Sequence, residues 1–233
     1  MESPFEHIKH KIMNAQIHQY PYPHISINEI FPPEFYEEIL ENIPETSLYT
    51  PKPKYPGRKT KTLDDLEKLE KSKQKFWNDI IQLLRSEEFA NILLEKFSVS
   101  KKGHSDLFIH KDLDDYEVTP HRDIRSKLIT YLFYLAENSN GKNLGTYLLV
   151  PNNGQEIEET TKHLPWDQFK IVKEIEYLPN TFFAFTPNKC SFHAVKAKFP
   201  KDAIKKERDT IRGFVFDREE KDFPGYLFKN SSM

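Results

Sequence analysis

The second half of the chain carries short runs of apolar and alternating residues that predict β-strands. The clearest run, Leu128 to Leu135, is apolar on both faces and is therefore expected to be a central strand. Turn residues at 138–141 and 179–180 separate such runs, and no helical pattern lies between them. Further strands are expected at 106–113, 146–150, 169–177, 181–186, 192–197 and 210–216. This succession predicts an antiparallel sandwich or jelly roll rather than a doubly wound parallel sheet.

Apolar residues in the first hundred positions recur instead at helical spacing. A short strand at 24–27 leads to Pro32-Pro33, and proline suits the first turn of the helix that the next apolar face predicts. A longer helical pattern runs from Leu63 to Phe97, after a segment rich in proline and lysine at 51–62. Helices followed by strands make the expected fold class α+β.

The same patterns predict one domain with a short tail. Residues 1–100 are expected to form a mainly helical N-terminal extension that packs on the core within the same domain. Residues 101–217 are expected to form the jelly-roll core, and residues 218–233 a C-terminal tail. A length of 233 residues suits a single domain of this kind.

Composition excludes several classes of protein. A mean hydropathy of −0.70 and the lack of a long uncharged apolar run argue against a membrane span. A single cysteine cannot form an internal disulfide, and the first residues lack the pattern of a signal peptide, so a cytoplasmic protein is expected. A formal net charge of −2 gives no overall attraction to nucleic acid.

Three histidines have an aspartate two positions later, at 104/106, 110/112 and 121/123. The first two pairs belong to the segment 103–113, entering or inside a predicted strand, where exposed or partly buried polar residues are the favoured interpretation. His121 follows Thr119-Pro120 and precedes the central strand, so His121 and Asp123 are expected to point to the same side at a strand end.

A second histidine, His193, follows the buried run at 181–186 and begins another strand. Two histidines and one carboxylate form a facial triad, which leaves adjacent coordination positions open on Fe(II). Four protein ligands would close the site and suit structural zinc instead.

Two arginines lie at and just before the last predicted strand. Arg208, Thr210 and Arg212 alternate onto one face, so they are expected to point together into the barrel. An inward arginine is costly unless an anion pairs with it, and a bidentate contact with a carboxylate is the natural use. The alternative is that Arg208 only continues the basic run of the preceding loop.

These residues together resemble the 2-oxoglutarate/Fe(II)-dependent oxygenases, particularly the prolyl-hydroxylase-like branch. The resemblance covers residues 104–217. It rests on Tyr116-x-Val118-x-Pro120-His121-x-Asp123, the strand Lys127–Leu135, Ser191-Phe192-His193-x-Val195, and Arg208-x-Thr210-Ile211-x-Gly213-Phe214. It implies a double-stranded β-helix, the cupin-like form of the jelly roll.

The resemblance implies roles for specific residues. The three ligands of Fe(II) would be His121, Asp123 and His193. Arg208, with Thr210 beside it, would bind the distal carboxylate of 2-oxoglutarate, with Arg212 as the competing candidate and Tyr131 adding a hydroxyl. With O2, such an enzyme hydroxylates an unactivated C–H bond of a small molecule or peptidyl side chain and releases succinate and CO2.

The sequence leaves other interpretations open. One is a non-catalytic, cupin-like module that binds a metal or ligand, and another is a metal-dependent hydrolase or isomerase on the same barrel. Lys111 and Lys127 could contact an acidic substrate, although solvated lysines are the favoured interpretation. The identity of the substrate and the oligomeric state are not determined by the sequence.

Overall fold

The structure, a computed structural model, describes residues 3–51, 60–63, 65–139, 143–154, 157, 163–203 and 205–219. Its helices are α1 (Pro4–Asn14), α2 (Pro33–Asn42), α3 (Lys71–Arg85) and α4 (Glu87–Lys96). Its strands are β1 (His24–Asn28), β2 (Thr50–Pro51), β3 (Thr60–Thr62), β4 (Gly103–Leu113), β5 (Glu117–His121), β6 (Lys127–Tyr134), β7 (Thr146–Pro151), β8 (Phe169–Ile175), β9 (Thr181–Phe185), β10 (His193–Lys196) and β11 (Glu207–Asp217).

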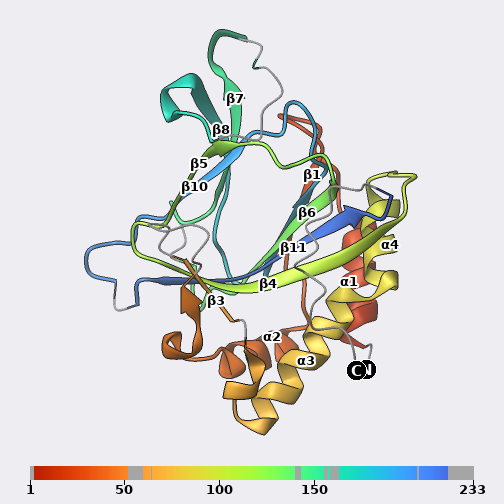
Figure 1. Ribbon diagram of the computed structural model, residues 1–233, viewed down its shortest axis with the longest axis vertical. Coiled ribbons are helices and arrows are strands. Elements are labelled where there is room, and N and C mark those ends of the chain that lie inside the picture. The colour runs from red at the N-terminus through yellow and green to blue at the C-terminus, as the bar shows by residue number, and fades with distance from the viewer. Residues whose placement is uncertain are drawn as a thin grey trace.

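The strands form two antiparallel sheets that face each other. The larger sheet has the order β1-β9-β6-β11-β4-β3-β2, and the smaller has the order β5-β10-β7-β8. Figure 1 shows the smaller sheet on one side of the barrel and the helices on the other side, against the larger sheet. The expected α+β class with a jelly-roll core is confirmed.

The helices cover the outer face of the larger sheet. On α3, the residues Trp77, Ile80 and Leu84 recur at helical spacing and are buried. Ser86 then ends α3 and begins α4, because its hydroxyl accepts a hydrogen bond from the Phe89 N–H at 3.1 Å. The helical pattern expected from Leu63 to Phe97 is therefore divided at this serine.

Helix α1 lies in a segment where no individual helix or strand was expected. Its signals are present in the sequence: Ser3 caps the helix by accepting a hydrogen bond from the Glu6 N–H, and Pro4 occupies the first turn. Ile8 and Ile12, one turn apart, are fully buried. Two apolar residues are a weak pattern, which explains why the helix was missed.

The first hundred residues also contribute strands to the larger sheet. Strand β1 pairs with β9, and β3 pairs with β4. These strands join the first hundred residues to the same sheet as the later strands. The expected boundary between an extension at 1–100 and a core at 101–217 stays a prediction. Most of the expected tail lies outside the described residues, as does most of the proline- and lysine-rich segment.

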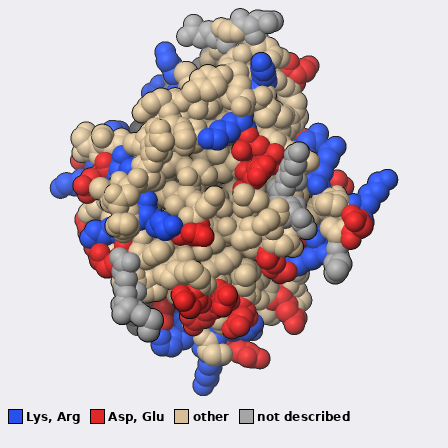
Figure 2. Space-filling model, turned by 180° about the vertical axis from the view of Figure 1, so that it is seen from behind, with Lys and Arg blue, Asp and Glu red and all other residues tan. Residues whose placement is uncertain are grey.

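The surface carries charges of both signs. Figure 2 shows acidic and basic side chains interspersed over one face of the molecule, in keeping with the small net charge. Among the described residues, no helix has both the length and the apolarity that crossing a membrane requires.

Gly145 precedes β7 and lies against the backbone at the end of β8. A Cβ atom at position 145 would lie 1.9 Å from the Ile175 carbonyl oxygen, and a backbone atom cannot rotate away. We expect Gly145→Ala to lower the free energy of unfolding by about 2–3 kcal/mol, measured by urea denaturation. Gly154→Ala is the control, since its Cβ would meet no atom within 4 Å and only its φ of +66° opposes alanine. An equal or larger loss in the control would contradict the steric explanation.

Candidate metal and co-substrate site

Two histidines meet across neighbouring strands of the smaller sheet. His121 ends β5, a strand that the sequence pattern did not predict, and His193 begins β10. The two residues are directly opposed in the antiparallel register, so their side chains share one face. Their ring centroids lie 4.3 Å apart.

Backbone carbonyls fix the orientation of both imidazoles. The Nδ1 atom of His121 lies 3.0 Å from the Thr119 carbonyl oxygen, and that of His193 lies 3.0 Å from the Ser191 carbonyl oxygen. A carbonyl oxygen can only accept a hydrogen bond, so each Nδ1 must carry the proton and donate the hydrogen bond. Each Nε2 is then left with a lone pair, which is the form that binds a metal.

Asp123 completes the cluster from the segment that follows β5. The Lys127 ammonium donates to its Oδ1 at 2.5 Å, and the Thr130 hydroxyl donates to its Oδ2 at 2.7 Å. This Oδ2 lies 3.8 Å from the Nε2 atom of His193. The ligand atoms of His121, Asp123 and His193 all lie within 4.8 Å of one another, and this is the group that could hold a metal ion among the described residues.

The electrostatics favour the protonation states that a metal requires. Burial, followed by the charge of His193, lowers the pKa of His121 well below its ordinary value. Burial also lowers the pKa of His193, although the Asp123 carboxylate opposes this. Burial raises the pKa of Asp123, but the Lys127 ammonium and the two imidazoles outweigh it, and the net pKa lies below the ordinary value. Neutral imidazoles and an ionised carboxylate are therefore expected at neutral pH.

The two lysines that were expected to be solvated are both paired with carboxylates; Lys111 is buried and Lys127 is partly exposed. Lys127, with its side chain 15% exposed, pairs with Asp123 and places its ammonium 3.6 Å from the centroid of the Phe214 ring. Lys111 pairs with Glu207 at 3.1 Å and with Asp209 at 2.6 Å. The expectation of solvated side chains is therefore wrong, because carboxylates far away in the sequence reach Lys111 and Asp123, four residues earlier in the chain, reaches Lys127.

Arg208 lies inside the barrel, as expected. It is 2% exposed, and its Nη1 atom donates to Asp112 Oδ2 at 2.6 Å. The guanidinium carbon lies 5.1 Å from the ring centroid of Tyr134 and 5.3 Å from that of Tyr177. Its Nε and Nη2 atoms are buried without a hydrogen-bond partner among the described residues. Arg208 thus retains donors that can bind a second anion.

Arg212 shares the inward face of β11 with Arg208 and Thr210. Its Nη2 atom lies 2.9 Å from the Nε2 atom of His110. His110 is buried inside the barrel and is not part of the metal-binding group. Thr210 is buried and stands opposite His110 on one side and Tyr134 on the other.

The placement of Tyr131 corrects an expectation. Tyr131 points away from the barrel interior to the helix-covered face, where its hydroxyl lies 2.8 Å from the Ser105 hydroxyl and its ring packs on Phe89. Successive residues of a strand point to opposite faces, and Thr130, which contacts Asp123, has the other parity. The hydroxyl of Tyr131 therefore cannot contact a ligand bound inside the barrel.

Tyr134 is the residue that sequence reasoning missed. It has the parity of Thr130, is fully buried, lies over Arg208 and places its hydroxyl 2.7 Å from the Thr146 hydroxyl. Burial raises the pKa of Tyr134, so its hydroxyl keeps its proton and can donate a hydrogen bond. The sequence signal for Tyr134 was the polar Thr130, because a polar residue in an otherwise apolar strand indicates which alternate residues face the interior of the barrel.

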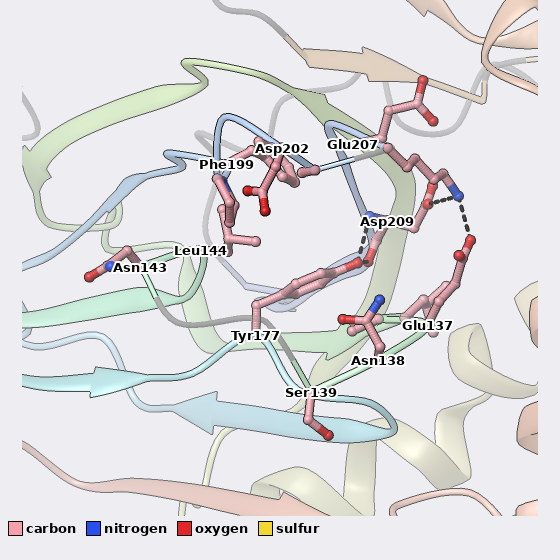
Figure 3. A pocket seen from close by; sticks show the side chains of 15 residues that line it. Glu137, Asn138, Ser139, Asn143, Leu144, Tyr177, Phe199, Asp202, Glu207 and Asp209 are labelled. Carbon is pink, nitrogen blue, oxygen red and sulfur yellow. Dashed lines mark hydrogen bonds and ion pairs between the residues drawn. The ribbon is translucent and has the colours of Figure 1, made fainter.

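A cavity of about 900 Å³ lies beside the start of β11, and it shares no lining residue with the histidine cluster. Figure 3 shows Tyr177 crossing it toward Asp209, with Glu137 to one side, and Lys205 is a further lining residue. The Tyr177 hydroxyl donates to the Asp209 carbonyl oxygen at 3.0 Å and accepts from the Asp209 N–H at 2.8 Å. Tyr177 also lies against Arg208, so it stands between this cavity and the arginine.

Comparison with known proteins gives matches in structure only. No family model and no curated protein matches the chain by sequence. A prolyl hydroxylase from Trichoplax adhaerens, in complex with a hypoxia-inducible-factor peptide fragment, aligns with a TM-score of 0.53 and 12% identity over 91% of this chain and 89% of that one.

Two bacterial structures align over similar lengths. A prolyl-4-hydroxylase from Pseudomonas putida has a TM-score of 0.50 and 10% identity over 92% of this chain and 99% of that one. HygX from Streptomyces hygroscopicus, with nickel, 2-oxoglutarate and hygromycin B bound, has a TM-score of 0.50 and 10% identity over 84% of this chain and 83% of that one. The protein therefore shares the jelly-roll fold of these prolyl hydroxylases and of HygX.

Proposed function

We propose that this protein is a 2-oxoglutarate- and Fe(II)-dependent oxygenase. The observation that carries the proposal is the compact group of His121, Asp123 and His193, held inside a barrel that prolyl hydroxylases share. Two nitrogen ligands and one carboxylate suit Fe(II) and leave coordination positions for a co-substrate and O2.

The donors of the group fit such a metal. Both Nε2 atoms are available because backbone carbonyls bind both Nδ1 atoms, and the carboxylate is anchored by Lys127 and Thr130. Bound there, Fe(II) with 2-oxoglutarate and O2 would supply oxidation of a C–H bond, with succinate and CO2 as products. The chain contributes the orientation of the ligands and a largely buried setting.

Arg208 is the proposed anchor for the distal carboxylate of 2-oxoglutarate. Its buried Nε and Nη2 atoms lack partners among the described residues, and a carboxylate would satisfy them. Tyr134, which lies over the guanidinium, and Thr210, on the same strand face, supply hydroxyls beside it. Asp112 holds the guanidinium in place through Nη1.

The reaction we propose is hydroxylation of an unactivated C–H bond in a small molecule or peptidyl side chain. Among the structural neighbours, one prolyl hydroxylase carries a peptide fragment and HygX carries hygromycin B, so this fold accommodates both kinds of ligand. A non-catalytic metal-binding module on the same barrel is the alternative, and it would not require the free donors of Arg208.

Anaerobic titration tests the proposal. Addition of Fe(II) and 2-oxoglutarate together, but of neither alone, should produce a weak visible charge-transfer band, and admission of O2 should then yield succinate. Metal binding without the band would favour the binding module. An activity that needs neither O2 nor 2-oxoglutarate would favour a metal-dependent hydrolase or isomerase.

A further inference from the structure

Arg212, unlike Arg208 and Lys127, has no carboxylate partner in the part of the chain that the structure describes. Arg208 pairs with Asp112, and Lys127 pairs with Asp123. Arg212 has no ion pair among the described residues, and its Nε atom is buried without a hydrogen-bond partner. A half-buried guanidinium with an unsatisfied donor is costly unless an anion binds to it.

The position of Arg212 is next to the metal-binding group. In the sheet register Arg212 stands opposite Leu132, and Phe214, two residues along β11, stands opposite Thr130, which donates to Asp123. The Lys127 ammonium, which pairs with Asp123, and the Arg212 guanidinium both lie near the Phe214 ring, at 3.6 and 5.8 Å from its centroid. Arg212 thus lies between the triad and Arg208 along the inward face of β11.

A second contact presents the guanidinium in a fixed orientation. Arg212 can only donate, so the Nε2 atom of His110 must accept from its Nη2 atom. The proton of His110 then sits on Nδ1, which donates to the buried Thr62 hydroxyl at 3.1 Å. This chain from Thr62 through His110 holds one amino group of Arg212, while Nε remains available.

We propose that Arg212 binds a carboxylate of the substrate, so that the oxidised molecule is an acid whose reactive carbon lies close to that carboxylate. The inference rests on the proposed function, and it assigns the two inward arginines to different ligands. The single distal carboxylate of 2-oxoglutarate can be held by one of them, and Arg208 offers two buried donors beside the Tyr134 hydroxyl. Arg212 is then the cation that remains for a second anion.

Binding measurements on the full chain test this without turnover. The protein is loaded with Mn(II) and N-oxalylglycine, an unreactive analogue of 2-oxoglutarate, and titrated calorimetrically. The probes are N-acetyl amino acids, the matching N-acetyl amino acid amides, and inorganic phosphate. We expect at least one N-acetyl amino acid to bind at least tenfold more tightly than its amide, and more tightly than phosphate.

Variants locate the carboxylate contact. Arg212→Gln should weaken binding of that acid at least tenfold and leave N-oxalylglycine binding within threefold, while Arg212→Lys should retain part of the affinity. Arg218→Gln is the matched control, because Arg218 is an exposed arginine beyond the barrel interior and should have no effect.

Three results would overturn the inference. Equal binding of every acid and its amide would exclude a carboxylate site, and tighter binding of phosphate would identify a phosphate site instead. Loss of N-oxalylglycine binding in Arg212→Gln, with Arg208→Gln unaffected, would make Arg212 the co-substrate anchor. Failure of the wild-type protein to bind Mn(II) and N-oxalylglycine at all would instead refute the proposed function.

Discussion

Replacing Asp123 with alanine is expected to abolish succinate formation and to lower the affinity for Fe(II) by at least about 100-fold. Loss of a group that merely orients a metal ligand already costs about 10–100-fold, and Asp123 is the anionic ligand itself. The two imidazoles would remain in place because the Thr119 and Ser191 carbonyls hold them. Anaerobic metal titration and a succinate assay measure the two effects, and full activity in the variant would remove Asp123 from the metal site.

Asp123 also pairs with the largely buried Lys127, so its loss affects folding as well as metal binding. Asp123→Asn keeps the shape and a hydrogen-bond acceptor for Lys127, and thermal denaturation of the metal-free variants separates the two effects. We expect both variants to fail in metal binding even where Asp123→Asn unfolds near the wild-type temperature.

His163 offers the matched control for the histidine ligands. Its ring centroid lies 4.7 Å from that of His121, and its Nδ1 atom lies 3.3 Å from the same Thr119 carbonyl oxygen. It is nevertheless not a member of the metal-binding group. His121→Ala should therefore abolish Fe(II)-dependent succinate formation, whereas His163→Ala should retain it. Equal losses would indicate that His163 takes part in binding the metal or the substrate.

The metal group could be found in the sequence because its signals are local. A histidine and an aspartate two residues apart precede a central strand, and a second histidine begins a strand after a buried run. The structure brings these segments together through one register pair, His193 opposite His121. The strand periodicity did not predict this pairing, because β5 was not among the expected strands; the family resemblance implied that the three residues share a metal.

The sequence did not show which alternate residues of β6 face the interior of the barrel. Residues 128–135 are apolar on both faces, so alternation does not say which set faces the barrel. This ambiguity placed Tyr131 at the co-substrate site, whereas the structure places Tyr134 beside Arg208. Ion pairs such as that of Lys111 with Asp209 depend on the register between strands about a hundred residues apart in the sequence. Local sequence patterns carry no information about that register.

Arg208→Ala is expected to raise the apparent 2-oxoglutarate requirement by at least about 30-fold. Truncating one partner of a buried, charged hydrogen bond costs about 2–5 kcal/mol, and about 2 kcal/mol corresponds to this factor. The guanidinium is 2% exposed, so water cannot replace its contacts with the co-substrate. Succinate formation as a function of 2-oxoglutarate concentration measures the effect, with Arg212→Ala as the comparison.

The ion pair with Asp112 complicates this substitution, because Asp112 is itself 3% exposed and would lose the arginine that neutralises it. The double variant Arg208→Gln/Asp112→Asn removes both charges together and should recover most of the stability that Arg208→Ala loses. If Arg208 anchors the co-substrate, the double variant should fold and still need the raised 2-oxoglutarate concentration. A stable double variant with a normal 2-oxoglutarate requirement would show that Arg208 only neutralises Asp112. The anchor would then be Arg212, whose guanidinium has no carboxylate partner among the described residues.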